Sequence, residues 1–209
     1  MDRKELLKKG LAELGYQSDS DQLHAFMTYL SELKKWNRTY NLTGLKKDED
    51  IIIKHFFDSL LYNRVIDNSE ITLADIGSGA GFPGLPLKIM KPEMEVFLIE
   101  PSGKKSAFLR YIISLLQMTK VQVIEKRVED VCKDTAFSVD IGVTRALFSI
   151  QEFIKKASGI VKPEGRLIMN KGPKVEDELK SLKNIHCEIV TLPLPLTDIK
   201  RFLVIVHLK

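Results

Sequence analysis

LADIGSGAGFPG, residues 73–84, joins a short apolar segment to a loop with glycines at positions 77, 79 and 81. Glycine permits positive φ angles and lets a ligand approach the backbone closely. Prolines 83 and 86 suit the first turn of a following helix, where backbone amides have no helical partner. The stretch therefore predicts a buried strand that carries Asp75, a ligand-binding turn and a helix.

The spacing of these glycines indicates which of two kinds of ligand the loop is suited to bind. A dinucleotide fold uses GxGxxG with a pyrophosphate on the helix N-terminus, but here the third glycine comes one residue early and Asp75 adds negative charge. S-adenosylmethionine has no phosphate and carries an ammonium and a sulfonium, so a carboxylate beside the loop favours it. Glu100 ends the next apolar run, VFLIE, at the place where an acid can bind ribose hydroxyls. We therefore expect a cofactor site on Asp75, Gly77, Ser78, Gly79, Gly81 and Glu100, the alternative being an ordinary turn and a solvated strand end.

From residue 71 onward, β-branched runs alternate with helical stretches, which is typical of βαβ units and a parallel sheet. The predicted strands are 72–76, 96–99, 121–124, 139–143 and 166–169, and the predicted helices are 86–90, 104–117, 149–160 and 175–182. Two late strands, 186–192 and 202–208, are joined by a proline-rich loop too short for a crossover helix, so they must be antiparallel. This arrangement predicts the α/β fold of class I S-adenosylmethionine-dependent methyltransferases, which is Rossmann-like and has a seven-stranded, mostly parallel sheet with an antiparallel last strand.

The first seventy residues have a helical period instead. Helices are predicted over 3–14, 19–36 and 48–65, with a loop from Trp36 to Gly44. We therefore divide the chain into an N-terminal helical extension, residues 1–70, packed on a methyltransferase domain, residues 71–209.

Composition narrows the class of protein further. The 209 residues are 44% hydrophobic and 29% charged, with no apolar run near the ~20 residues that a membrane span needs. The N-terminus lacks the apolar core of a signal peptide, so we expect a cytoplasmic protein without a membrane partner, and a monomer. Cys132 and Cys187 lack metal-ligand spacing, which favours buried free thiols and no metal site. The net charge of +4 permits a nucleic-acid partner, and the basic excess lies after residue 70.

Several short motifs, in order along nearly the whole chain, resemble a known family: the bacterial small-subunit ribosomal RNA guanine-N7 methyltransferases, also called the glucose-inhibited division protein B family. The motifs are WNRTYNLT (36–43), KHFFDS (54–59), DIGSGAGFPGLPL (75–87), GKKSAFL (103–109), RVE (127–129), TRA (144–146) and KG (171–172). The chain departs from the family at Glu100 and Pro101, where Asp and Ser are usual, and at Lys54, which is commonly Arg. Glu is longer by one methylene, so a ribose contact survives with a shifted geometry.

The resemblance implies the roles of individual residues. Gly77, Phe82 and Pro101 would lie against the cofactor, Val128 and Glu129 would border its adenine, and Arg145 would stand at the mouth near the methyl group. Each also has an ordinary interpretation: Phe82 as a core residue at a helix start, and Glu129 as a solvated acid.

The implied reaction is S-adenosylmethionine-dependent methylation of N7 of one guanine in small-subunit (16S) ribosomal RNA. Guanine N7 has a lone pair and no proton, so in-line displacement needs no general base. In agreement, VTRALFS replaces the NPPY-like tetrad of amino methyltransferases after the fourth strand, and no Cys stands there. Arg145 and Lys171 are the candidate catalytic residues because Arg and Lys suit guanine O6 and phosphate oxygens.

The expected partner is small-subunit ribosomal RNA or the 30S particle. Its candidate ligands are Asn37, Arg38, His55, Lys104 and Lys105, with Lys34, Lys35 and Arg110 nearby, although basic pairs of this kind are ordinarily a solvated helix face. Trp36 and Tyr40 are as consistent with packing as with stacking on a base. His55 and Asp58 are either structural or substrate-positioning. Two alternatives stay open: a class I methyltransferase of a small molecule or protein, and a ribosome-associated cofactor-binding module without catalysis.

Overall fold

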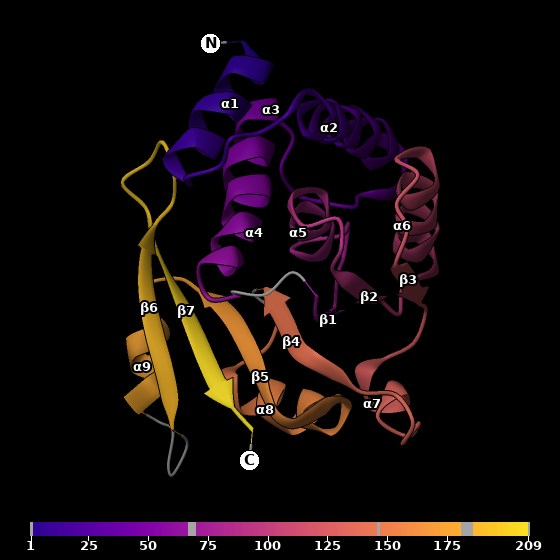
Figure 1. The fold of residues 1–209 in the computed structure, drawn as a ribbon, viewed down its shortest axis with the longest axis vertical. Helices are drawn as coiled ribbons and strands as arrows, with labels where there is room; N and C mark the ends of the chain where they lie inside the picture. Colours follow the sequence, from indigo (N-terminus) through magenta and orange to yellow (C-terminus); the bar gives the residue numbers. More distant parts are fainter. Residues whose placement is uncertain (1, 67–69, 146, 181–185, 209) are drawn as a thin grey trace.

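A seven-stranded sheet with the order β3-β2-β1-β4-β5-β7-β6 forms the centre of the molecule (Figure 1). The structure is a computed structural model that describes residues 2–66, 70–145, 147–180 and 186–208. The strands are β1 (Thr72–Ile76), β2 (Glu95–Ile99), β3 (Val121–Ile124), β4 (Val139–Arg145), β5 (Val161–Lys171), β6 (Cys187–Pro193) and β7 (Lys200–His207). β1 to β5 pair in parallel, and β7 is antiparallel to both β5 and β6. The predicted sheet with a reversed last strand is confirmed.

Helices cover both faces of this sheet. The described helical segments are α1 (Arg3–Glu13), α2 (Ser20–Tyr40), α3 (Asp48–Ile51), η1 (Ile52–Phe57), α4 (Asp58–Leu60), η2 (Leu61–Arg64), α5 (Gly84–Met90), α6 (Gly103–Leu115), α7 (Val128–Val131), α8 (Ile150–Ala157), η3 (Ser158–Ile160) and α9 (Val175–Lys180). One hydrophobic cluster joins α1 to α6 with sheet residues such as Leu73 and Val143. A second cluster joins α7, α8 and α9 with Ala74 and Met169 on the other face. Adjacent strand residues such as Leu73 and Ala74 therefore serve opposite cores, as the two-residue repeat of a strand requires.

The strand order places a binding crevice at one edge of the sheet. β1 lies between β2 and β4, so the chain leaves β1 in one direction along the sheet and later returns on its other side. In such sheets, ligands bind outside the carboxyl ends of the strands at this switch point. The loops that follow β1, β2, β3 and β4 all reach this edge.

The short helix α7 was not predicted, and the predicted helix 149–160 ends in the 3₁₀ turn η3. Two predicted helices of the N-terminal extension also differ from the structure. α2 continues four residues beyond Trp36 to Tyr40 and ends where Asn41 adopts a left-handed φ of 50°, because nothing in Asn37–Tyr40 breaks a helix and Asn tolerates that conformation. The predicted helix 48–65 is divided: its middle, Ile52–Phe57, is π-helical, and it ends in a 3₁₀ turn. Ala146 of the TRA motif and Leu182 at the end of the last predicted helix lie outside the described residues.

The structure also bears on membranes and thiols. Within the described ranges, no helix is both long and apolar enough to cross a bilayer. Cys132 and Cys187 are free thiols, and both are half-buried rather than buried as predicted, since each lies close to the protein surface.

Candidate active site

Backbone hydrogen bonds join the glycine loop to the end of β2. The amides of Gly77 and Ser78 donate to the carbonyl of Ile99 at 2.8 and 3.2 Å. Gly77, Gly79 and Gly81 have φ angles of 72°, 60° and 101°, the left-handed region that favours glycine. The loop therefore has the conformation that its glycines predicted.

Glu100 joins this loop to the start of α6. One carboxylate oxygen accepts from the amide of Gly79 at 2.8 Å, and the other accepts from the amide of Ser102 at 2.9 Å. The side chain is 5% exposed. The two segments on which the predicted cofactor site depends, the glycine loop and the acid at the end of β2, are in direct contact.

Asp75 lies beneath the loop and is fully buried. Its Oδ2 accepts from the amide of Gly84 at 2.9 Å, whereas its Oδ1 has no hydrogen-bond partner among the described residues. Burial raises the pKa of Asp75 to about 7, although the Gly84 amide favours the ionised form. A cation bound nearby would lower this pKa again.

This raised pKa predicts how stability changes with pH. Between about pH 4 and pH 7 the folded state holds a proton that the unfolded state has released, so the contribution of Asp75 to the free energy of unfolding falls as pH rises, by up to about 1.4 kcal/mol per pH unit. Asp75→Asn removes this titration. We expect its free energy of unfolding, measured by urea denaturation and relative to the unsubstituted chain, to increase from pH 5 to pH 8.

Asp140→Asn is the matched control. Burial would raise the pKa of Asp140, but hydrogen bonds from Lys162 and Thr72 lower it to about 2. The stability that this carboxylate contributes is lost only as pH falls through that range, so the effect of Asp140→Asn stays constant between pH 5 and pH 8. A constant difference for Asp75→Asn as well would contradict the assigned titration.

A pocket opens at the carboxyl ends of β1, β2 and β3. Four residues with predicted cofactor contacts line it: Gly77, Pro101, Val128 and Glu129. Leu147, Phe148 and Lys156 line the opposite side. A side chain at position 77 would meet Leu147, since a Cβ there would lie 2.2 Å from its Cδ2. Apolar walls with a few polar groups suit a nucleoside.

Sequence reasoning did not identify Leu147, Phe148 and Lys156. Lys156 pairs with Glu129 and lies 5.7 Å from the ring centre of Phe148. The available signal was a pair of large apolar residues directly after the fourth strand, at the edge where ligands bind.

Seven of the predicted cofactor residues do not line this pocket: Asp75, Ser78, Gly79, Gly81, Phe82, Glu100 and Arg145. Phe82 is 5% exposed, with its ring stacked on Tyr29 and His55. The Ser78 hydroxyl donates to the carbonyl of Asp75 at 2.8 Å, and Gly81 packs against Leu85. Their contact with the cofactor stays a prediction.

Arg145, at the end of β4, is held from several sides. Its Nη1 donates to the carbonyl of Lys54 at 2.9 Å and lies 3.6 Å from Asp58 Oδ2, and its Nη2 donates to His55 Nδ1 at 2.8 Å. The guanidinium lies 5.2 Å from the ring centre of Phe82. A guanidinium has five N–H groups. Nε–H and one Nη2–H have no hydrogen-bond partner within the described part of the chain.

His55 is fixed in one neutral tautomer by these contacts. Arginine only donates, so Nδ1 must accept, and the proton resides on Nε2, which lies 2.7 Å from Thr43 Oγ1. Burial and the nearby charge of Arg145 lower the pKa of His55 to about 3. Thr43 is held in turn by Asn37, whose amide group bonds both the N–H and the carbonyl of Thr43 at 2.9 Å. A chain of hydrogen bonds thus runs from α2 to Arg145.

Asp58 completes the support of Arg145 from the other side. It is 5% exposed, and its Oδ1 accepts from Arg201 Nε at 2.7 Å and from Asn170 Nδ2 at 3.1 Å. A buried carboxylate between two guanidinium groups is charge-compensated. Sequence reasoning missed Asn170 and Arg201, which lie 112 and 143 residues along the chain from Asp58.

The tautomer of His55 predicts an asymmetry between two substitutions. The Asn side-chain oxygen can take the place of Nδ1 and accept from Arg145, whereas the Gln side chain reaches the place of Nε2 and leaves Arg145 without this acceptor. Both remove the ring that stacks on Phe82. We therefore expect His55→Asn to retain kcat within about threefold and His55→Gln to lose about tenfold or more, since a hydrogen bond from a charged donor is worth about 1.5 kcal/mol or more. Steady-state kinetics of methyl transfer tests this prediction. Equal losses of kcat in the two variants would contradict it.

Comparison with known proteins identifies the family. A family model described as rRNA small subunit methyltransferase G (GidB) matches residues 22–192. A protein named Ribosomal RNA small subunit methyltransferase G from Geobacter sp. (strain M21) is 38% identical over 210 residues, covering 97% of this chain and 96% of that protein. A protein of the same name from Acetivibrio thermocellus is 35% identical over 219 residues, covering 99% and 90%. The chain belongs to this family. The resemblance stated from its motifs is confirmed.

Solved structures show the same fold at low sequence identity. TrmN from Thermus thermophilus has a TM-score of 0.57 and 12% identity, covering 76% of this chain and 53% of that chain. The 16S rRNA N2 methyltransferase of the same organism, in complex with AdoMet and guanosine, has a TM-score of 0.54 and 20% identity, covering 73% and 43%. The predicted class I methyltransferase fold is confirmed for this member of the methyltransferase G family.

Lys171, the second predicted catalytic residue, is engaged with the loop after β4. Its ammonium donates to the carbonyl of Phe148 at 2.6 Å and pairs with Glu178 at 2.9 Å, and its side chain is 14% exposed. It therefore holds the loop whose residues Leu147 and Phe148 line the pocket beside Gly77. A contact with guanine stays a prediction.

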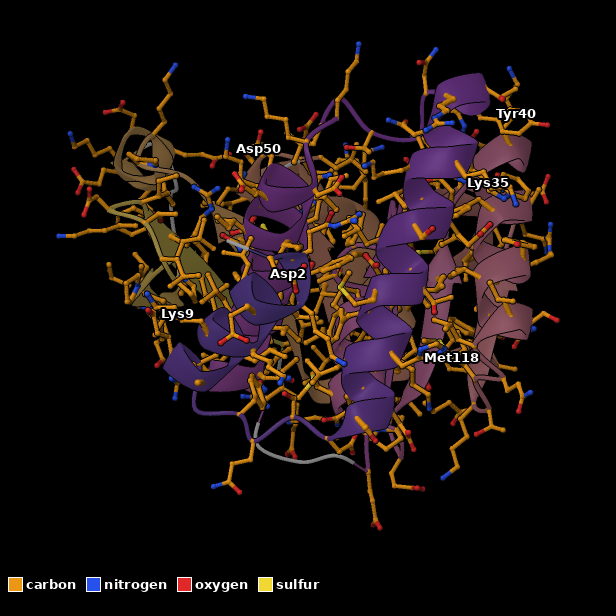
Figure 2. The ribbon with its side chains drawn as sticks, turned by 90° about the horizontal axis from the view of Figure 1, so that it is seen from above. Asp2, Lys9, Lys35, Tyr40, Asp50 and Met118 are labelled. Atoms are coloured by element: carbon orange, nitrogen blue, oxygen red, sulfur yellow. The ribbon has the colours of Figure 1, made fainter. Side chains whose placement is uncertain are left out.

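The predicted RNA-binding cations differ in how they are compensated. Lys34 pairs with Asp48, Lys35 with Glu32 and Arg110 with Glu125. Arg38, Lys104 and Lys105 make no ion pair within residues that the structure describes. They lie where the end of α2, marked by Tyr40 in Figure 2, meets the start of α6.

The rings of Trp36 and Tyr40 contact each other, with their centres 5.4 Å apart, but the two residues differ in their other surroundings. Trp36 packs between α2 and α6, against the rings of Phe108 and Tyr111. Tyr40 is 43% exposed. Of the pair, the structure places Trp36 in the packing and leaves Tyr40 accessible to a base.

Proposed function

We propose that this chain transfers a methyl group from S-adenosylmethionine to N7 of one guanine in small-subunit (16S) ribosomal RNA. One observation carries the proposal: the glycine loop, held by Glu100, and the partly unpaired guanidinium of Arg145 meet at the carboxyl edge of the sheet in a member of the methyltransferase G family. The first group suits the cofactor and the second suits the base.

The residues at this edge fit the cofactor. Gly79, at positive φ, leaves room above the loop, the unpaired Asp75 Oδ1 favours a cation, and the pocket that Val128 lines suits an adenine. Glu100 would turn from the amides it now binds to the ribose hydroxyls. When bound, S-adenosylmethionine supplies an electrophilic methyl group on a sulfonium.

The groups around Arg145 favour a reaction without a general base. His55 is neutral, but its Nδ1 lone pair accepts from Arg145, so it has no free site for a proton. Asp58 is buried and bound by Arg201 and Asn170. Guanine N7 needs neither, because its lone pair carries no proton.

Alignment then supplies the rate enhancement. The two remaining N–H groups of Arg145 would bind guanine O6, and Lys171 would bind O6 or an adjacent phosphate. Correct placement of reacting groups can lower a barrier by ~7 to 11 kcal/mol. Arg145 is suited to this role because four neighbouring groups fix its plane.

The RNA would lie across the surface that carries Arg38, Lys104 and Lys105. Their uncompensated charge attracts a polyanion, and releasing its counterions makes binding depend on salt. We place the protein in the cytoplasm with the small-subunit RNA or 30S particle as its partner, acting as a monomer.

Mapping of modified nucleosides by mass spectrometry tests the proposal. Unmodified 16S RNA, naked and assembled into particles, is incubated with the chain and S-adenosylmethionine and then digested. We expect a single 7-methylguanosine. A methyl group at another atom would contradict the N7 assignment, and RNA that stays unmethylated in both forms would contradict the whole proposal.

A further inference from the structure

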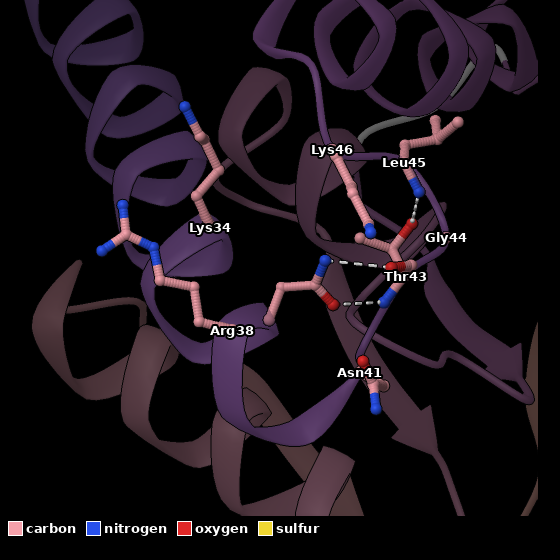
Figure 3. A pocket seen from close by; sticks show the side chains of 8 residues that line it. Lys34, Arg38, Asn41, Thr43, Gly44, Leu45 and Lys46 are labelled. Carbon is pink, nitrogen blue, oxygen red and sulfur yellow. Dashed lines mark hydrogen bonds between the residues drawn. The ribbon is translucent and has the colours of Figure 1, made fainter.

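A second, open pocket lies between the end of α2 and the loop that leads to α3, and we name it the α2–α3 groove (Figure 3). Its lining includes Lys34, Asn37 and Arg38 from the helix and Thr43, Gly44 and Lys46 from the loop. Figure 3 shows Lys34 and Arg38 on the helix side of the groove and Lys46 on the loop side. The groove therefore has positive charge on both walls.

This charge is partly uncompensated. None of the described residues that line the groove carries a carboxylate, and Lys34 is paired with Asp48, which Arg3 also binds at 2.9 Å. Arg38 and Lys46 are exposed and make no ion pair with any described residue. Two cations thus face each other across the groove without an ion-pair partner among the described residues.

Hydrogen bonds to Thr43 hold the loop wall of the groove in one conformation. The Asn37 amide group spans both backbone polar groups of Thr43, and Thr43 Oγ1 accepts from the amide of Leu45 at 3.2 Å. A Cβ at Gly44 would touch nothing within 4 Å, so the wall is open to a ligand there. A preorganised site loses little entropy when it binds.

The groove is also connected to Arg145. Thr43, in its wall, accepts from His55, and His55 accepts from Arg145. Two hydrogen bonds therefore separate the groove from the guanidinium that we place against the target base. Because only these two hydrogen bonds and the imidazole ring lie between them, one RNA strand can contact both Arg145 and the groove.

We propose that the α2–α3 groove binds a phosphodiester of the RNA strand beside the target guanine, through Arg38 and Lys46. This inference rests on the proposed function and adds a phosphate subsite to it. Arginine matches phosphate oxygens in a bidentate manner, and phosphate contacts set the register of a nucleic acid without reading its sequence. The lining holds no aromatic ring on which a base could stack.

The test compares two double variants with the same loss of charge. Arg38→Gln/Lys46→Gln removes the two groove cations. The control Lys9→Gln/Lys47→Gln removes two exposed cations that do not line the groove: Lys9 on α1 (Figure 2) and Lys47, the next residue after Lys46 in the sequence. Binding to a fluorescent fragment of deproteinised 16S RNA is measured as a function of salt. Methyl transfer is measured on the form of RNA that the unsubstituted chain methylates, and S-adenosylmethionine binding is measured by calorimetry.

We expect the groove variant to weaken RNA binding about tenfold at low salt and to reduce the slope of log K against log salt by about 0.7, the value for one phosphate contact on a single strand. The KM for RNA rises by the same factor, while kcat and cofactor affinity stay within about twofold. The control variant changes each quantity less than threefold.

Three outcomes would overturn the inference. Equal effects of the two double variants would show that only net charge matters. An unchanged salt slope would show that the groove contacts no phosphate. A defect on 30S particles with unchanged binding to deproteinised RNA would show that the groove contacts a ribosomal protein instead. All three are distinct from failure of the proposed function, in which the unsubstituted chain itself transfers no methyl group to RNA.

Discussion

Arg145→Gln lowers the kcat of methyl transfer by about 100- to 1,000-fold and leaves the affinity for S-adenosylmethionine within about threefold. The glutamine amide cannot reproduce the fork that binds the Lys54 carbonyl and His55 and still presents N–H groups to guanine. Loss of one preorganised donor at a reacting group costs a factor of this size. Single-turnover methyl transfer, followed with labelled cofactor, measures it. Arg145→Lys does not restore the rate, because an ammonium is a point charge without the planar fork.

Arg201→Gln is the control for the buried charge. Arg201 binds Asp58 from the opposite side, so its loss leaves the same carboxylate undercompensated without removing a group from the methyl-transfer mouth. Both variants lose stability in urea denaturation, but kcat falls sharply only for Arg145→Gln. Similar kcat values in the two would assign Arg145 to the scaffold.

Gly79→Ala weakens S-adenosylmethionine binding by about tenfold or more. Gly79 has a φ of 60°, its amide binds Glu100, and an added Cβ would meet no side chain, so the methyl projects into the space where we place the cofactor. The left-handed conformation costs alanine about 1 to 2 kcal/mol of stability. Calorimetric titration with the cofactor gives the affinity.

Gly15→Ala is the control that distinguishes backbone strain from the loss of a contact with the cofactor. Gly15 has a φ of 83°, and an added Cβ there would also meet nothing within 4 Å, but it lies in the turn after α1. We expect a similar loss of unfolding free energy and unchanged cofactor affinity. If Gly79→Ala binds the cofactor as tightly as Gly15→Ala does, the cofactor does not rest on this loop.

The parts that depend on local sequence were predictable. β1 and β3 have the predicted bounds, since a buried parallel strand is a short β-branched run between turn residues. The glycines at positions 77, 79 and 81 predicted positive φ angles. Glu100 directly follows β2, so its place at the same edge of the sheet was also predictable. Periodicity and turn chemistry carry that information.

The parts that depend on distant contacts were not predictable. Asp58 meets Arg201 only because β7 inserts between β5 and β6. The π-helical segment that carries His55 has the hydrophobic period of an ordinary helix, so its sequence shows no interruption. The left-handed Asn41 that ends α2 is followed by Thr43, which Asn37 binds, and propensity alone does not reveal these hydrogen bonds.

A crystal structure of the chain with S-adenosylhomocysteine tests the central claim most directly. We predict that the nucleoside lies over Gly77 and Gly79, with both ribose hydroxyls within hydrogen-bond distance of the Glu100 carboxylate and the sulfur facing the mouth where Arg145 stands. Glu100 still bound to the amide of Gly79 while the ligand occupies another part of the surface would contradict it.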